Sequence, residues 1–204
     1  MNILAIGAHP DDIEFGCGGT LIRYGQKGHA VHLLVLTAGE IGGDPEQRQC
    51  EQERAARFIR AKKVFWGDFP DTEIPRDRRV ITLIEDVMKK VRPQIVFFNY
   101  LADVHQDHRA LAHAALSASR YIQEVLYYEV PTTQNFDPDV FVDISSVMEK
   151  KLKLLKIHCS QAHRTRVKNL SILESAKSCA IFRGYQGRVK YAEGFKALRI
   201  LRTI

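Results

Sequence analysis

The sequence predicts an α/β fold in which a mainly parallel sheet is flanked by helices. Three observations support this prediction: strand-like and helix-like segments alternate from the first residue, the strand-like segments are apolar throughout, and clusters of polar residues follow two of them. Strands that are separated by helices of about ten or more residues pair in parallel through right-handed crossovers. Continuously apolar strands fit such a sheet, because helices cover both of its faces.

The strands of the first part of the chain are short runs of aliphatic and β-branched residues, as at 30–37 (AVHLLVLT). They are expected at residues 2–8, 30–37, 63–66 and 94–99. If their order follows the usual 3-2-1-4-5 of Rossmann-like sheets, the first and fourth strands are neighbours. Ligands bind at the carboxyl ends of the strands at this switch point.

The helices between these strands are recognised by the spacing of apolar residues and by residues that begin or end a helix. They are expected at residues 18–26, 46–60, 80–91 and 109–120. Lys27-Gly28 ends the first, Pro45 precedes the second, and Pro93 stops the third.

The pattern becomes mixed after about residue 121. Strands are expected at 125–129, 140–142 and 191–195, and a helix at 144–158. The sequence shows no internal repeat, low-complexity tract or linker. We therefore expect a single domain over residues 1–204, with a Rossmann-like core at about 1–120 and a C-terminal extension at about 121–204.

Length and composition are those of an ordinary globular protein. The chain has 204 residues, of which 45% are hydrophobic and 26% charged, enough for one sizeable core. No apolar run reaches the roughly 20 residues that span a bilayer, and the apolar N-terminus lacks the basic flank of a secretory signal. The four cysteines have no Cys-x-x-Cys spacing, so we expect reduced thiols and a cytoplasmic location.

Charge is unevenly distributed. From residue 150 to 204, 14 Lys and Arg face only Glu174 and Glu193, so this third carries +12 and the rest of the chain −6 of the net +6. Such a region either attracts an anionic ligand or is a solvated face that meets an acidic surface. Because no aromatic residues are interleaved as in a nucleic-acid platform, no nucleic-acid partner is expected.

A cluster of acids and one imidazole follows the first strand, at His9-Pro10-Asp11-Asp12-Ile13-Glu14. Crowding these groups beside an apolar strand costs several kcal/mol unless a cation compensates, and a divalent metal would do so. His9 and Asp12 are three residues apart and can face one point on a turn. Asp11 would then point away from that point, yet lie close enough to accept a proton from a water bound to the metal. Alone, this segment could equally be a turn with an Asp helix cap.

The second cluster, Asp103-Val104-His105-Gln106-Asp107-His108, follows the fourth strand. One of its imidazoles would complete a His-Asp-His set with positions open for water and substrate, as in a catalytic zinc site. His-x-x-His alone is common on exposed helices. The two clusters together, at the ends of strands expected to be adjacent, indicate a metal site.

Gly16-Cys17-Gly18-Gly19 opens the first helix and must be weighed against a dinucleotide-binding loop. Acids fill the preceding turn and would repel a pyrophosphate, and the spacing differs from Gly-x-Gly-x-x-Gly. We interpret the glycines as positions where the helix packs closely on the sheet.

The motifs resemble those of the LmbE/PIG-L family of N-acetylglucosaminyl deacetylases. The resemblance rests first on residues 8–21 (AHPDDIEFGCGGTL) and 105–108 (HQDH), and it continues through 36–40, 48–51, 138–145, 158–161 and 191–195. It therefore spans most of the chain and implies an LmbE/PIG-L-like fold. Gln106 stands where the family usually has Pro, which loosens the turn that carries both histidines but removes no ligand. Family members are often hexameric, so the resemblance also implies a homo-oligomer.

The resemblance implies a role for each of eight residues. Metal ligands would be His9, Asp12 and His108, holding Zn²⁺ or Fe²⁺, since such a site accepts either ion. Asp11 would be the general base, protonated His105 the electrophile, and Asp107 the residue that holds the His105 ring. Arg48 would contact substrate, and Glu14 would shape the site or hold a sugar hydroxyl, unless it only stabilises a helix N-terminus.

These roles imply a metal-dependent hydrolase that deacetylates an N-acetylglucosamine-type conjugate, releasing acetate and a free amine. Two alternatives stay open. The same site could hydrolyse another amino-sugar amide or a thiol conjugate. The protein could instead be a non-catalytic module whose metal holds the fold, with His105 as a fourth ligand that closes the site.

Overall fold

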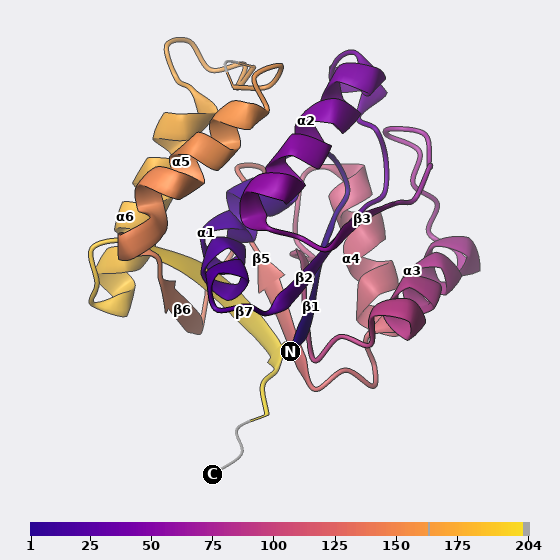
Figure 1. Ribbon diagram of the computed structural model, residues 1–204. Coiled ribbons are helices and arrows are strands. Elements are labelled where there is room, and N and C mark those ends of the chain that lie inside the picture. Colours follow the sequence, from indigo (N-terminus) through magenta and orange to yellow (C-terminus); the bar gives the residue numbers. More distant parts are fainter. Residues whose placement is uncertain (163, 202–204) are drawn as a thin grey trace.

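The computed structural model describes residues 1–162 and 164–201 and contains one seven-stranded sheet (Figure 1). Residues 163 and 202–204, which include Arg202 at the end of the basic third, lie outside the described residues. The strands are β1 (Asn2–Gly7), β2 (Ala30–Val35), β3 (Lys63–Trp66), β4 (Ile95–Asn99), β5 (Glu124–Tyr128), β6 (Val140–Asp143) and β7 (Ala192–Arg199).

The helices are α1 (Asp12–Gln26), α2 (Pro45–Ile59), α3 (Arg78–Val91), α4 (Gln106–Ala118), α5 (Met148–Ile157) and α6 (Ile172–Gly187), with 3-10 turns η1 (Glu40–Gly42) and η2 (Ser145–Val147). None of the described helices is long and apolar enough to cross a membrane.

The sheet order is β3-β2-β1-β4-β5-β7-β6, so the predicted order 3-2-1-4-5 is confirmed. The first five strands pair in parallel, and β7 joins β5 and β6 in antiparallel fashion. The mainly parallel sheet flanked by helices is therefore confirmed as well. Because β1 and β4 are paired, the segments that follow them leave the same edge of the sheet next to each other.

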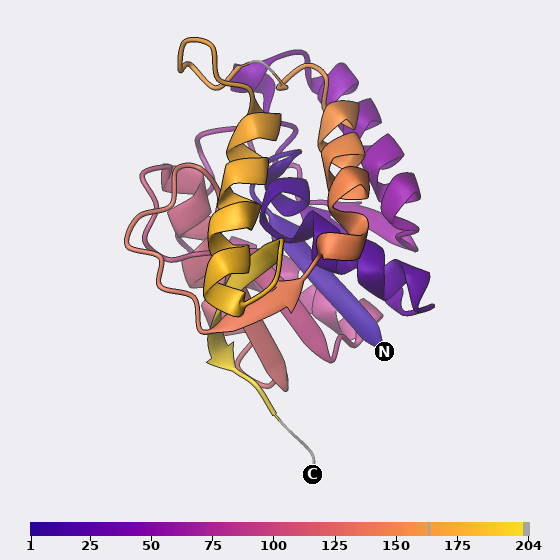
Figure 2. The ribbon, with the colours of Figure 1, turned by 90° about the vertical axis from the view of Figure 1, so that its left-hand side faces the viewer.

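Alternating residues of the buried strands send side chains into two separate cores. Ile3 and Ala5 of β1 face the layer that contains α1, α2, α5 and α6, whereas Leu4 and Ile6 face α3 and α4. This accounts for the continuously apolar strands, because both faces of the sheet are covered (Figures 1 and 2).

Three helix predictions need correction. α1 begins at Asp12 rather than residue 18, and α4 begins at Gln106 rather than residue 109. In both cases the added first turn carries acidic side chains, which the helix dipole stabilises. α6 was not predicted, although Ser171 and Glu174 form a capping box at its start. The residues that bear the predicted chemistry thus lie in the first turns of two helices.

Gly16 allows α1 to lie directly on the sheet. A Cβ atom at this position would overlap the Tyr128 ring on β5. The Tyr128 hydroxyl in turn donates to the Ile6 carbonyl at 2.8 Å. The interpretation of this glycine as a packing residue is therefore confirmed.

Candidate active site

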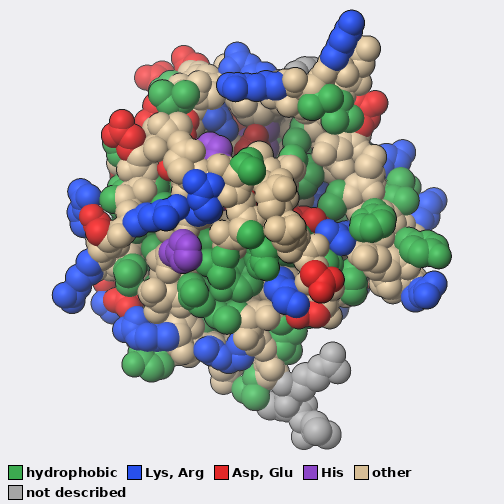
Figure 3. All heavy atoms as spheres, turned by 180° about the vertical axis from the view of Figure 1, so that it is seen from behind, with side chains coloured by type: hydrophobic (Ala, Val, Ile, Leu, Met, Phe, Trp, Pro, Cys, Tyr) green, Lys and Arg blue, Asp and Glu red, His purple; other side chains and the backbone are tan. Residues whose placement is uncertain are grey.

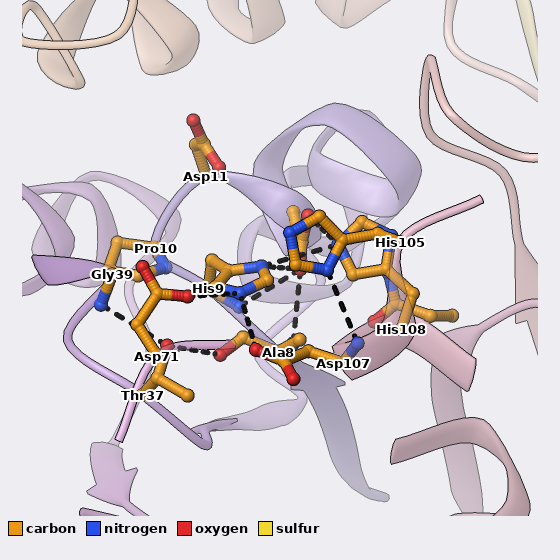
Figure 4. Close-up of polar contacts among 12 residues, drawn as sticks. Ala8, His9, Pro10, Asp11, Thr37, Gly39, Asp71, His105, Asp107 and His108 are labelled. Atoms are coloured by element: carbon orange, nitrogen blue, oxygen red, sulfur yellow. Dashed lines mark hydrogen bonds and ion pairs between the residues drawn. The ribbon is translucent and has the colours of Figure 1, made fainter. Parts of the chain in front are cut away.

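The two predicted clusters meet at the carboxyl edge of the sheet (Figure 4). His9 lies in the turn after β1, and Asp12 is the first residue of α1. His108 lies in the first turn of α4, and His105 is the N-cap residue of that helix. The register pairs Ile6 with Phe98. The two clusters therefore follow two paired strands, β1 and β4, and each begins a few residues after the end of its strand.

The three predicted metal ligands converge on one point. His9 Nδ1 lies 3.3 Å from His108 Nε2 and 3.6 Å from Asp12 Oδ2, and His108 Nε2 lies 3.3 Å from Asp12 Oδ1. Tetrahedral ligands at the usual zinc distances are about 3.3–3.4 Å apart. Two nitrogens and a carboxylate at these separations fit a zinc or iron ion.

Both imidazoles have their far nitrogen fixed by buried carboxylates. His9 Nε2 lies 3.0 Å from Asp71 Oδ1 and 3.2 Å from Asp107 Oδ2. His108 Nδ1 lies 3.2 Å from Asp103 Oδ2. A carboxylate at the far nitrogen keeps the proton there and leaves the other nitrogen's lone pair free to bind a metal. The two rings are therefore oriented as ligands.

The surrounding acids also change the pKa of both rings. Burial opposes protonation of His9, but Asp107, Asp12 and Asp71 raise its pKa well above the ordinary value. Burial likewise opposes protonation of His108, but Asp12 and Asp103 raise its pKa to about 9. The site is therefore strongly attractive to positive charge, whether protons or a metal ion.

His105 lies beside both of these rings. It stacks on His108 with ring centroids 4.7 Å apart and meets His9 edge-on at 4.6 Å. Its Nδ1 accepts the backbone N–H of Asp107 at 3.3 Å. Burial and the charges on His9 and His108 lower the pKa of His105. A lowered pKa favours a neutral ring, which carries its proton on Nε2 because Nδ1 accepts the Asp107 N–H, whereas the role of His105 as a protonated electrophile stays a prediction.

Asp107 also differs from expectation. Its carboxylate accepts the backbone N–H groups of Thr72 at 2.7 Å and Ile74 at 3.3 Å, besides contacting His9. Only its backbone N–H reaches the His105 ring. Because α4 begins at Gln106, the Asp107 side chain leaves the helix toward the loop before α3 and not toward His105. Asp107 therefore supports His9.

Asp11 is held in a strained backbone conformation. Its φ of 97° is rare for a residue with a Cβ atom, and such strain clusters at functional sites. The carboxylate points away from the three imidazoles (Figure 4), and 27% of the side chain is exposed. Burial raises the pKa of Asp11 to about 6, although Arg48, 3.9 Å away, opposes the shift.

Arg48 and Glu14 are both buried. The Arg48 guanidinium donates to the carbonyl oxygens of Gly39 at 2.6 Å and Pro10 at 2.9 Å, so it holds the turn before Asp11. Glu14 accepts from Gln52 Nε2 at 2.7 Å and lies 3.5 Å from His158 Nε2. Substrate contact by Arg48 and Glu14 stays a prediction, and the structure shows both residues in contact with other protein groups.

Four residues of the site were not predicted: Asp71, Asp103, Gln52 and His158. Asp103 belongs to the second sequence cluster, 103–108. Its position shortly after β4 is the signal that could have identified it. His158 lies in a segment that the family resemblance included. Asp71 lies in a loop that carries no motif, and Gln52 lies on α2 directly after the segment 48–51 of the resemblance but outside it.

The cluster opens to solvent on the face shown in Figure 3. A hollow near the top of this view shows histidine and acidic side chains at its bottom and basic side chains at its rim. Four buried acids (Asp12, Asp71, Asp103 and Asp107) surround the two ligand-type imidazoles. A cation that enters through this opening would balance the excess negative charge of these acids.

Comparisons with known proteins agree with this arrangement. A family model described as GlcNAc-PI de-N-acetylase (PIG-L) matches residues 4–119. The uncharacterized deacetylase YaiS of Escherichia coli (strain K12) is 38% identical over 167 residues, covering 78% of this chain and 90% of YaiS. Diacetylchitobiose deacetylase of Thermococcus kodakarensis is 34% identical over 190 residues, covering 78% of this chain and 69% of that protein.

The fold is likewise that of a solved structure. The conserved protein TT1542 from Thermus thermophilus superposes with a TM-score of 0.88 and 27% identity, covering 100% of this chain and 97% of the other.

Proposed function

Since the chain belongs to the PIG-L (LmbE-like) family, as its motifs indicated, we propose that it is a metal-dependent deacetylase of N-acetylglucosamine-type conjugates. Relatives with this domain include a deacetylase of diacetylchitobiose, and the family model is named for de-N-acetylation of a GlcNAc conjugate. The reaction would release acetate and leave a free amine on the sugar.

One observation carries this proposal: His9 Nδ1, Asp12 and His108 Nε2 converge within 3.3–3.6 Å of one another. Carboxylates hold the opposite nitrogen of each imidazole, so both rings present a lone pair to the same point. We propose these three residues as the ligands of Zn²⁺, with Fe²⁺ as the alternative. When bound, such an ion acts as a Lewis acid that polarises a carbonyl and lowers the pKa of water.

Asp11 is proposed as the general base. With a pKa of about 6, its carboxylate is largely ionised at neutral pH yet basic enough to take a proton. It would remove a proton from water as the water oxygen adds to the acetamide carbon. The same carboxyl group would then protonate the departing nitrogen as the C–N bond breaks. Arg48 fixes the Pro10 carbonyl and so supports the strained Asp11 backbone.

His105 is proposed to stabilise the oxygen of the acetamide as it gains negative charge. Because Nδ1 accepts the Asp107 N–H, the neutral ring carries its proton on Nε2 and donates from there. Stacking on His108 and contact with His9 hold the ring in place. Asp107 contributes through His9 and through its backbone N–H.

The test compares wild type with His108→Ala. We expect about one zinc or iron ion per wild-type chain, loss of the ion in the variant, and acetate release from N,N'-diacetylchitobiose by wild type only. His113→Ala is the matched control, since His113 is exposed on the same helix α4 and should keep both properties. A wild type that binds no zinc when zinc is added would refute the proposal.

Two narrower alternatives have their own outcomes. Metal binding without acetate release, but with amine release from other amino-sugar amides or thiol conjugates, would move the proposal to those substrates. A purely structural metal requires a fourth protein ligand, and His105 is near enough to supply one. The absorption spectrum of the cobalt-substituted protein should change on adding acetate if the site is open, and stay unchanged if His105 closes it.

A further inference from the structure

The segment that joins α5 to α6, residues 158–171, carries positive charge without any acid. It contains Arg164, Arg166 and Lys168 and no Asp or Glu, and the structure describes all of it except residue 163. All three cationic side chains are exposed, and the Lys and Arg ion pairs among the described residues do not include them. Figures 1 and 2 show the segment at the top of the molecule. These cations are therefore open to an anion from outside the chain.

The first part of this segment is fixed to two helices. Buried His158 lies 3.5 Å from Glu14 of α1. Ser160 donates to the Glu51 carboxylate from its backbone N–H at 3.0 Å and from its hydroxyl at 2.6 Å. Glu51 is itself buried in α2. The segment thus has a defined position beside the site.

Arg164 is placed against the glycine-rich turn of residues 39–43. Its guanidinium donates to the Gly42 carbonyl oxygen, and Gln161 Nε2 donates to the same oxygen at 3.2 Å. A Cβ atom at Gly42 would lie only 2.6 Å from Arg48 Nη1. Gly42 therefore contacts both an exposed guanidinium, that of Arg164, and a buried one, that of Arg48.

Arg48 connects this position to the proposed reaction centre. Its Nη2 lies 3.9 Å from Asp11 Oδ1, on the proposed base. The turn is also tied to the histidine cluster, because Ile41 donates its backbone N–H to Asp71 Oδ2 at 3.0 Å. Basic side chains line the rim of the opening in Figure 3. A conjugate whose acetamide reaches the cluster can therefore place its other end beside Arg164.

The positive charge of Arg164 is not cancelled by its hydrogen bond. Arg48 donates to two carbonyl oxygens and Arg164 to one, and a carbonyl oxygen has no net charge. Two acids belong to the same part of the rim, but Glu40 accepts the Asp71 N–H at 2.8 Å and Asp44 caps α2. A guanidinium matches the geometry of a carboxylate or a phosphate with paired hydrogen bonds.

We propose that the 158–171 segment recognises a negatively charged substituent of the substrate, a phosphate or a carboxylate, and that Arg164 contacts it. The proposal rests on the proposed deacetylase function, because it concerns the part of the conjugate that does not react. Arg166 and Lys168 would add to the attraction without a fixed contact. Of the two roles that the sequence left open for the basic third, this proposal favours attraction of an anionic ligand.

The test compares three conjugates that differ in the charge of the substituent. They are methyl N-acetylglucosaminide, its carboxymethyl counterpart and N-acetylglucosamine 1-phosphate. Calorimetric titration of Asp11→Asn, which should not consume them, measures each Kd, and acetate release by wild type measures turnover separately. We expect at least one anionic conjugate to bind about fivefold more tightly than the methyl conjugate, the upper range for an exposed ion pair. Salt at about 0.5 M should reduce this preference.

Variants at the segment locate the contact, each made in the Asp11→Asn chain. Arg164→Gln should bring the ratio of the anionic to the neutral Kd close to one, whereas Arg164→Lys keeps the charge and should retain most of the preference. A merely structural effect would change both Kd values alike and leave their ratio unchanged. Arg166→Gln with Lys168→Gln should reduce the preference by a smaller factor. Arg57→Gln is the matched control, since Arg57 is exposed about three turns along α2 from its start.

The two proposals fail in different ways. Acetate release with equal Kd values for all three conjugates would keep the deacetylase and overturn the anionic substituent. An anionic preference that Arg164→Gln abolishes, without acetate release from any conjugate, would support the segment's role and refute deacetylation of these sugars. A preference that survives in a folded Arg164→Gln protein would overturn the assignment. If thermal melts show that this variant is unfolded, the double variant of Arg166 and Lys168 decides, and an unchanged ratio there would overturn the role of the segment.

Discussion

Two polar clusters among the described residues differ in charge balance. The site cluster holds the carboxylates of Asp12, Asp71, Asp103 and Asp107 against the imidazoles of His9 and His108. The C-terminal cluster holds two complete ion pairs, Lys151 with Glu193 and Arg183 with Glu129. The first is buried and the second is buried except for the half-buried Glu129, and only the second has a full cationic partner for every carboxylate.

The C-terminal cluster is satisfied by its own residues. Lys151 Nζ donates to Glu193 at 2.5 Å and to the Phe15 carbonyl at 2.6 Å. The Glu193 carboxylate also accepts the backbone N–H groups of Gly19 at 2.8 Å and Thr20 at 2.7 Å. This cluster joins α5 and β7 to α1 and needs nothing from outside the chain.

The site cluster is not satisfied in this way. Burial alone would raise the pKa of Asp71 and of Asp103, but their imidazole partners hold each pKa below the ordinary value, so both stay charged at neutral pH. Several negative charges therefore surround two imidazoles. Among the ion pairs of the described residues, none joins a Lys or Arg to these four carboxylates. The balanced cluster is therefore suited to stabilising the fold, whereas the unbalanced one has the charge that the proposed metal ion would neutralise.

The largest expected effect is on the reaction. Asp11→Asn removes the proposed base without touching the three proposed ligands, so kcat for acetate release should fall about 10²–10⁴-fold. The metal content should stay at the wild-type level, which separates the base from the ligands. Turnover near that of wild type in this variant would remove Asp11 from the mechanism.

The next largest effect is expected when an ion pair of the balanced C-terminal cluster is broken. Lys151→Met leaves Glu193 buried without its cation and should lower the free energy of unfolding by about 3–5 kcal/mol. Adding Glu193→Leu should recover much of the loss, because an apolar pair can replace a buried ion pair. Denaturant titration measures both, with Lys150→Met as the exposed neighbouring control. Loss of metal in a folded Lys151→Met protein would contradict the separation of the two clusters.

A smaller effect is expected when one acid is removed from the unbalanced cluster. Asp103→Asn weakens the hold on His108 and should reduce metal affinity about 10–100-fold. Its metal-free stability should change far less than that of Lys151→Met, since the cluster already has excess negative charge. Competition with a chelator measures the affinity, and Asp86→Asn, an exposed acid paired with Lys89, is the control. If Asp103→Asn and Lys151→Met lowered the free energy of unfolding equally, the proposed difference between the two clusters would be wrong.

The sequence predicted the sheet order and the positions of the ligand candidates for one physical reason. Apolar strands followed by acids and imidazoles are local features, and parallel pairing brings their ends together. The predicted starts of α1 and α4 are too late because Asp and His are weak helix formers, whereas at the first turn the helix dipole stabilises the acidic side chains of Asp12, Glu14 and Asp107. The capping box of Ser171 and Glu174 is a local sequence signal for the start of α6.

The supporting residues were harder to predict because they act over long separations along the chain. Asp71 reaches His9 from a loop 62 positions away, a contact with no local pattern. The side-chain direction of Asp107 depended on where α4 begins, so the error in that boundary carried over to its expected contact with His105. Such contacts follow from tertiary packing and not from periodicity.

The smallest expected effect concerns a buried pair, Glu14 with His158, that belongs neither to the site cluster nor to the C-terminal cluster. Gln52 accepts the Asp11 backbone N–H at 3.4 Å and donates to Glu14 at 2.7 Å, and Glu14 pairs with His158. Gln52→Ala removes this link to the strained Asp11 backbone, so kcat should fall about tenfold through misplacement of the carboxylate. KM and metal content should not change, because no proposed ligand is touched.

Steady-state kinetics and metal analysis would measure this, with Gln49→Ala on the same helix as the control. Reduced kcat alone would show that the buried residues Gln52, Glu14 and His158 also position the base. Reduced metal content would instead place Gln52 and Glu14 with the unbalanced cluster. An unchanged kcat would mean that Arg48, through the Pro10 carbonyl, is sufficient to hold Asp11.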